Sequence, residues 1–117
     1  EKNKSMKDAM FGIVGLETSA ALTYTELVDK GILTPMQMAE KMSYNPAKIL
    51  GIAGEKGSVS EGMIADIVIF DPKREYRIDK NTFLSKGKNT PFDNYAVKGD
   101  VRYTFVGGKM VYENTAY

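Results

Sequence analysis

The side chains that usually build hydrolytic and metal centres are missing from this sequence. Its 117 residues include no histidine and no cysteine. Histidine is the commonest general base near neutral pH, and histidine and cysteine are the usual ligands of zinc. The sequence also has no pair of carboxylates in a pattern typical of an acid-base site. It therefore predicts no catalytic residue and no metal ligand within the chain.

The composition of the chain argues against two classes of partner. The 16 Lys and Arg residues and the 15 Asp and Glu residues are interspersed, so no basic surface for nucleic acid is predicted. The apolar runs are too short to span a bilayer, and the first residues lack a signal-peptide pattern. The absence of cysteine suits a reducing compartment. We expect a cytoplasmic protein that binds neither nucleic acid nor membranes.

The first half of the chain has the periodicity of helices. Apolar residues recur at helical spacing from Glu17 to Lys30, and Gly31 follows as a stop signal. Thr34, Pro35 and Gln37 form the pattern of a capping box and start a second helix. Two helices are therefore predicted here.

A third, short helix is predicted next. Asn45 would cap it, Pro46 would take its first position, and Gly51 would stop it. Met36 and Met42 lie at helical spacing in the second helix and are interpreted as core side chains, because methionine usually fills gaps in cores.

From Gly54 onward the pattern favours strands. Glycines separate short runs rich in β-branched and aromatic residues. The Gly107-Gly108 pair suits a tight hairpin turn, and the alternation from Val101 to Val106 predicts that the odd positions face a core. The predicted strands are Ile67–Phe70, Glu75–Ile78, Val97–Val106 and Lys109–Tyr112. The chain is thus α+β, and its layers need further cover.

In this half of the chain, Asp66 is the carboxylate that could most easily be taken for a catalytic residue. Gly57 and Gly62 permit tight turns shortly before it, and Asp66 stands where a predicted buried strand begins. A carboxylate at such a place can accept backbone hydrogen bonds. We interpret Asp66 as structural.

Three segments of the chain together resemble one family. They are FGIVGLET (11–18), NPAKILG (45–51) and GSVSEGMIADIVIFD (57–71). The last two are similar to the end of amidohydrolase-superfamily enzymes. FGIVGLET and a fourth segment, SKGKNTPF (85–92), are similar to dihydroorotases within that superfamily.

The resemblance implies a particular architecture. The chain would be the C-terminal part of a dihydroorotase, an α+β fragment. Residues 1–53 would form the terminal helices of a (β/α)8 amidohydrolase barrel, including a substrate loop. Residues 54–117 would form the C-terminal strands of a small β-sandwich domain.

The resemblance also implies a chemistry and a site. Such enzymes use zinc to interconvert N-carbamoyl-L-aspartate and dihydroorotate, small-molecule substrates, in de novo pyrimidine biosynthesis. Their metal ligands lie in H-x-H and D-x-x-x-H motifs, and Asp8 does not fit because Gly12 stands where the histidine should be. The backbone matching Phe11 and Gly12 approaches the substrate, so these two are the candidate substrate-binding residues. The fragment alone is expected to be inactive and to bind no zinc.

The chain departs from the dihydroorotase pattern at two places. Compared with the family pattern, Met10 stands where a proline is common, and Asp93-Asn94 stands where an apolar residue and a glycine are usual. Both differences affect the expected loop geometry.

Two alternative functions are also open. They are an allantoinase or hydantoinase, and a non-catalytic dihydroorotase-like scaffold. Uncovered apolar faces would make the isolated chain self-associate, so a homo-oligomer is a further expectation.

Overall fold

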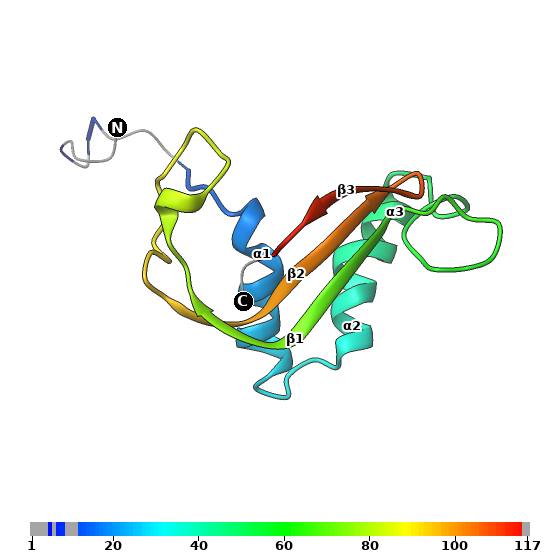
Figure 1. Ribbon diagram of the computed structural model, residues 1–117, viewed down its shortest axis with the longest axis horizontal. Helices are drawn as coiled ribbons and strands as arrows, with labels where there is room; N and C mark the ends of the chain where they lie inside the picture. Colours follow the sequence, from blue (N-terminus) through cyan, green and yellow to red (C-terminus); the bar gives the residue numbers. More distant parts are fainter. Residues whose placement is uncertain (1–4, 6, 9–11, 116–117) are drawn as a thin grey trace.

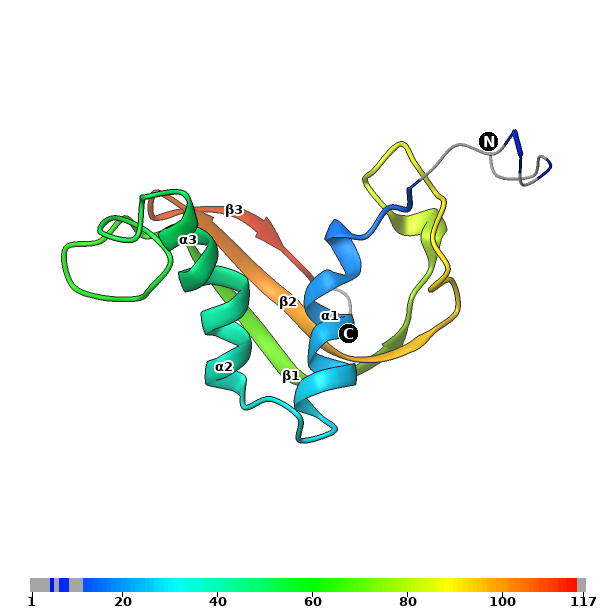
Figure 2. The same cartoon turned by 180° about the vertical axis from the view of Figure 1, so that it is seen from behind.

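Two helical segments lie on one side of a three-stranded antiparallel sheet in the computed structural model, which describes residues 5, 7–8 and 12–115 (Figures 1 and 2). The first helical segment joins a 3-10 turn (Leu16–Thr18), α1 (Ser19–Thr23) and a π-helical turn (Tyr24–Val28). The second joins α2 (Pro35–Ala39), a π-helical turn (Glu40–Tyr44) and α3 (Asn45–Ile49). The strands are β1 (Ile67–Arg77), β2 (Ala96–Val106) and β3 (Lys109–Glu113), with a 3-10 turn (Lys80–Thr82) after β1.

The predicted start of the second helix is confirmed. The Thr34 hydroxyl accepts from the Gln37 N–H at 3.2 Å, and the Gln37 side chain accepts from the Thr34 N–H at 2.8 Å. These reciprocal bonds satisfy two backbone donors that would otherwise lack a helical partner. Gly31, with φ +72°, follows the first helix as predicted.

The predicted third helix is present as α3, but it continues directly from the second helix and Asn45 does not cap it. Asn45 has helical φ and ψ of −64° and −43°, and its N–H donates to the Glu40 carbonyl, so it is not a cap. Pro46 has no N–H, and in a regular α-helix its ring would clash with the carbonyl of the preceding turn. The wider turn at Glu40–Tyr44 precedes the proline, and the helix continues through it.

The sheet has the order β1-β2-β3, with both pairs antiparallel. Gly107 and Gly108 have positive φ angles of +55° and +79° and form the predicted hairpin turn between β2 and β3. β1 is one strand where two were predicted. Its register is irregular between Asp71 and Glu75, around Pro72, so a bulge interrupts the ladder without ending the strand.

A second bulge interrupts the predicted alternation in β2 at Arg102, while Val101, Tyr103 and Phe105 are partly buried. Ile69 pairs with Tyr103 while the next residue, Phe70, pairs with Val101, so Arg102 is an extra residue on β2. An inserted residue reverses which side of the strand faces the core. Arg102 is therefore only 9% exposed, and Val101 is half-buried.

The described core is small. Ala21 from α1, Val97 from β2 and Ile78 after β1 are its buried members. Partly buried apolar side chains pack against these three: Leu22, Tyr76, Phe83 and Phe92. Nearby, the rings of Tyr24 and Phe70 lie 5.4 Å apart over Gly99. The first helix is thereby held on β2.

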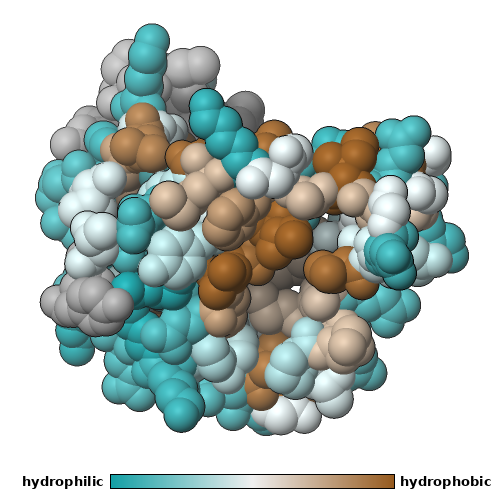
Figure 3. Space-filling view, turned by 45° about the vertical axis from the view of Figure 1, so that its right-hand side comes forward, coloured by the Kyte–Doolittle hydropathy of each residue, from teal (hydrophilic) through white to brown (hydrophobic). Residues whose placement is uncertain are grey.

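Much apolar surface is exposed, as expected. Met36 is 78% exposed and Met42 is 40% exposed, so their prediction as core does not hold among the described residues. Ile49 and Leu50 at the end of the same helix are also exposed. Apolar side chains gather on a hollowed face of the molecule (Figure 3). None of the helices formed by the described residues has the length and apolar character that a bilayer crossing requires.

Candidate functional site

Two segments that the sequence analysis singled out lie against each other, although they are far apart along the chain. The Val14 N–H donates to the Asn89 carbonyl at 2.9 Å. The Asn89 side-chain amide donates to the Gly12 carbonyl at 2.6 Å. Asn89 thus holds residues 12–14 through both its backbone and its side chain. We call residues 12–15 the Gly12 loop and residues 83–90 the support loop.

Glu17, in the 3-10 turn that follows the Gly12 loop, makes a second connection to the support loop. Its carboxylate accepts from the Leu84 N–H at 2.8 Å and from the Ser85 N–H at 3.0 Å, one bond to each oxygen. Hydrogen bonds to an ionised carboxylate are about twice as strong as neutral ones. Both oxygens of Glu17 are therefore committed to the backbone of the support loop.

Gly12, a predicted substrate-binding residue, lies exposed at the start of this arrangement. Its φ is +94°, and a Cβ built on it would meet nothing within 4 Å. The position therefore favours glycine because of its backbone conformation, not because of close packing. Phe11, the other predicted residue, lies outside the described residues.

An open hollow of about 430 Å³ lies beside the two loops. It is largely apolar, and Leu16 and Leu84 on its wall are 93% and 87% exposed. Glu17 is its titratable side chain. Because that carboxylate accepts from two N–H groups, it is suited to fixing the loops. The lining residues are Ile13, Val14, Gly15, Leu16, Glu17, Thr18, Phe83, Leu84 and Ser85.

The residues that the structure describes do not fit a zinc site. Within the described ranges, no group of three or more His, Cys, Asp or Glu side chains could hold a metal ion. Asp66 is engaged otherwise: it accepts from the Gly107 N–H at 2.7 Å and from the Lys56 ammonium at 2.5 Å. The bond from Lys56, followed by that from Gly107, lowers the pKa of Asp66. The predicted backbone hydrogen bond to Asp66 is therefore present.

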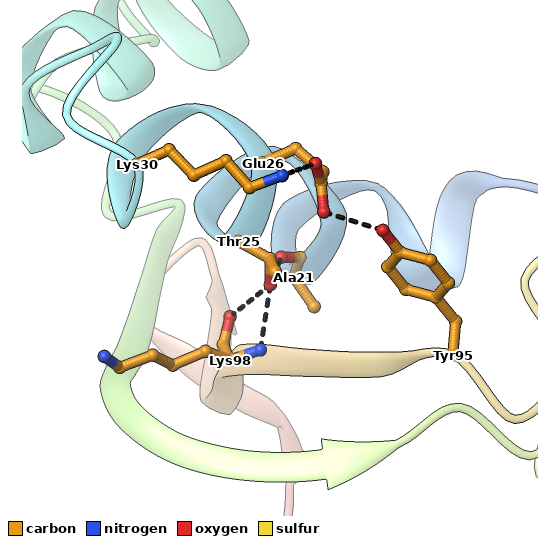
Figure 4. Close-up of polar contacts among 6 residues, drawn as sticks. All are labelled: Ala21, Thr25, Glu26, Lys30, Tyr95 and Lys98. Atoms are coloured by element: carbon orange, nitrogen blue, oxygen red, sulfur yellow. Dashed lines mark hydrogen bonds and ion pairs between the residues drawn. The ribbon is translucent and has the colours of Figure 1, made fainter.

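A polar cluster joins the first helix to β2, as Figure 4 shows. The Thr25 hydroxyl accepts from the Lys98 N–H at 2.8 Å and lies 2.7 Å from the Ala21 carbonyl, to which it donates. The Tyr95 hydroxyl donates to Glu26 at 2.8 Å. The Lys30 ammonium also contacts Glu26, and it is the largest cause of the lowered pKa of that carboxyl. The helix that follows the Gly12 loop is thereby fixed to the sheet.

Replacing Thr25 with valine is expected to destabilise the fold by about 1–3 kcal/mol, because the half-buried Lys98 N–H loses its acceptor while the side-chain volume is kept. The free energy of unfolding, from urea titration followed by circular dichroism, is the measurement. Thr25→Ser keeps the hydroxyl and serves as the control. Equal stability of the valine variant and the wild type would contradict the assignment.

Residues 3–111 match the amidohydrolase family. The chain belongs to the amidohydrolase family. Among similar amidohydrolases is a dihydroorotase from Geobacter metallireducens, 46% identical over 97% of this chain and 26% of the relative. Dihydroorotases from Pelotomaculum thermopropionicum and Anoxybacillus flavithermus are 46% and 47% identical with the same coverage. The chain thus spans about a quarter of the length of these relatives.

Solved amidohydrolase structures share the fold of this chain. L-hydantoinase (dihydropyrimidinase) from Arthrobacter aurescens superposes with a TM-score of 0.85 at 38% identity, over 90% of this chain and 23% of that one. Dihydropyrimidinase from Brevibacillus agri gives a TM-score of 0.77 at 31% identity, over 83% and 21%. The α+β arrangement with its three-stranded sheet is therefore one that longer amidohydrolases contain.

The sequence identified the Gly12 loop but missed the two residues that hold it. Glu17 and Asn89 both lie in segments that carried the family resemblance, FGIVGLET and SKGKNTPF. Pattern alone does not show that these segments touch. A local signal was present only for Glu17, the one charged residue in FGIVGLET, because Asn89 stands among other polar residues in SKGKNTPF.

Proposed function

We propose that this chain is the C-terminal part of a dihydroorotase and that it supplies the Gly12 loop to the substrate site. The enzyme would interconvert N-carbamoyl-L-aspartate and dihydroorotate. The observation that carries the proposal is the docking of the support loop on the Gly12 loop through Asn89 and Glu17. The two segments that resemble dihydroorotases thereby form one structural unit, in a chain 46% identical to proteins of that name.

The proposed architecture follows from the same relatives. Residues 1–53 would be the last helices of a (β/α)8 barrel, and residues 54–117 would be the C-terminal strands of a β-sandwich domain. The change from helices, which end at Ile49, to strands, which begin at Ile67, and the superposition on hydantoinases support this division. We propose a cytoplasmic enzyme of pyrimidine biosynthesis that works as a homo-oligomer.

The role we assign to this chain is binding, and no step through a metal is assigned to it. The described residues do not fit a zinc site, so in this proposal the zinc ligands belong to the remainder of the enzyme. At Gly12 the chain exposes its backbone without a side chain. Such a backbone can hydrogen-bond an amide or carboxylate at close range, which suits both substrates. Phe11 is proposed as the neighbouring contact on the resemblance alone.

A hydantoinase is the second candidate, favoured by the 38% identity and TM-score of 0.85 with the L-hydantoinase structure. Turnover of dihydroorotate, hydantoin and allantoin by the full-length, zinc-loaded protein separates the candidates. We expect kcat/KM for dihydroorotate to exceed the others by about 100-fold or more, as sites built around a substrate's polar groups allow. Preference for hydantoin or allantoin would refute the proposal.

The role of Gly12 is tested in the same full-length protein. Alanine at a φ of +94° is strained, so Gly12→Ala must shift the backbone that meets the substrate. We expect kcat/KM for dihydroorotate to fall by about tenfold or more, as about 1–2 kcal/mol of strain implies. Gly62→Ala is the matched control, because Gly62 has a similar φ of +84° and an equally open surrounding but lies outside the Gly12 loop. Equal activity of both variants would remove Gly12 from the site.

The third candidate, a non-catalytic scaffold, is distinguished without an assay. The reading frame that precedes this chain should encode an H-x-H motif and a D-x-x-x-H motif if the protein is an enzyme. A barrel with those positions substituted would instead favour the scaffold.

A further inference from the structure

We propose that Asn89 and Glu17 are positioning residues, through which the support loop sets the conformation of the Gly12 loop for substrate binding. This inference rests on the proposed function and adds to it. It means that the support loop, which follows β1 and lies outside the proposed barrel portion, contributes to substrate affinity.

Asn89 determines where the Gly12 carbonyl points. Residues 12–15 precede the first helix and have no regular secondary structure of their own. Two hydrogen bonds connect this loop to Asn89. The Asn89 side-chain amide donates to the Gly12 carbonyl at 2.6 Å, and the Val14 N–H donates to the Asn89 carbonyl at 2.9 Å. A peptide group is planar, so fixing the Gly12 carbonyl also fixes the direction of the next N–H.

Glu17 fixes the distance between the loops. Its carboxylate spans two successive N–H groups, those of Leu84 and Ser85, so the support loop cannot slide along the helix start. Glutamine in its place would keep one acceptor but would turn a donor toward the other N–H. The pair of bonds therefore requires a carboxylate.

The support loop makes a contact within itself and a contact with the Gly12 loop. The Lys88 ammonium donates to the Phe83 carbonyl at 2.5 Å and closes the loop on itself. A Cβ on Gly87 would lie 2.8 Å from the Val14 side chain, so the two loops are in close contact there. A rigid support that locks the residues meeting a ligand is what precise binding sites use. The arrangement is thus built to hold one conformation of residues 12–14.

The test uses the full-length, zinc-loaded protein and three variants of one residue type. Asn89→Ala removes the amide donor, and Asn89→Asp places a carboxylate against the Gly12 carbonyl. Asn81→Ala is the matched control, because the Asn81 amide donates to a neighbour along the chain, Asp79, at 2.8 Å. We expect KM for dihydroorotate to rise about fivefold or more in Asn89→Ala and further in Asn89→Asp, with kcat changed less than twofold, as loss of one positioning hydrogen bond predicts.

Glu17→Gln is expected to raise KM in the same way, with Glu40→Gln, on an exposed helix surface, as its control. Melting temperatures are recorded for every variant. A rise in KM without a matching loss in melting temperature supports positioning. An unchanged KM in both Asn89 variants, with wild-type turnover intact, overturns the inference.

The role of Asn89 can be tested even if the proposed function is wrong, by measuring KM for another substrate or amide hydrogen exchange. If the wild type prefers hydantoin, the proposed function fails, and KM for hydantoin then decides the inference in the same variants. If the wild type turns over none of the substrates, exchange at the amides of residues 12–16 decides it. Faster exchange there in Asn89→Ala than in Asn81→Ala supports the inference, and equal exchange overturns it.

Discussion

Replacing Gly99 with alanine is expected to destabilise the protein by about 2–4 kcal/mol, one of the two largest effects we foresee. Gly99 has a φ of +94°, and a Cβ there would lie 2.3 Å from the Phe70 ring and 3.2 Å from the Tyr24 ring. These rings form part of the contact between the first helix and the sheet. Because the rings would have to separate, packing is lost in addition to the backbone strain. Urea unfolding followed by circular dichroism measures the difference.

Gly62→Ala separates the effect of backbone strain from the effect of lost ring packing. Gly62 has a similar φ of +84°, but a Cβ there would meet nothing within 4 Å. This variant should lose about 1–2 kcal/mol from strain alone. If Gly62→Ala and Gly99→Ala are equally destabilised, the aromatic contact does not depend on Gly99.

Replacing Gly57 with alanine is expected to have a similar effect, about 2–4 kcal/mol of lost stability. Its φ is +94°, and the new Cβ would lie 2.5 Å from the Ala47 Cβ and 3.2 Å from the Ser43 carbonyl oxygen. Here the obstacle is the α3 helix and the turn before it, which cannot rotate away as a long side chain can. The loop after α3 must therefore lift off the helix.

A double-mutant cycle tests that contact. Ala47→Gly alone should cost about 1–2 kcal/mol, because it places glycine in a helix and removes a buried methyl group. In the Gly57→Ala background the same change also removes the clash, so the combined loss should fall short of the sum by about 1 kcal/mol or more. Strict additivity would show that the two positions do not touch.

The parts of the fold that short-range patterns encode were predicted from the sequence. Thr34, Pro35 and Gln37 mark the start of a helix because the capping box is a local arrangement. Gly107 and Gly108 mark a hairpin because a tight turn needs positive φ angles. Each feature depends on residues within a few positions of one another.

The parts that were missed depend on partners distant in sequence. The bulge at Arg102 is defined by pairing with Ile69 and Phe70 on β1, and no local signal in β2 shows it. The continuation of the helix through Pro46 depends on a wider turn before it, which propensity does not reveal. The support loop docks on residues more than 60 positions earlier, so Asn89 could not be linked to Gly12. The resemblance pointed to both segments but not to their contact.

The bulge around Pro72 in β1 also matters for how the protein avoids unwanted assembly. In the described sheet β1 is an edge strand, with β2 on its inner side. An unbroken edge offers a row of free backbone groups to which a strand of another molecule can add. Proline has no N–H to offer, and the irregular register from Asp71 to Glu75 bends the edge away from a straight template. Where the bulge breaks the ladder, this edge therefore does not present the continuous row of backbone groups that an added strand would need.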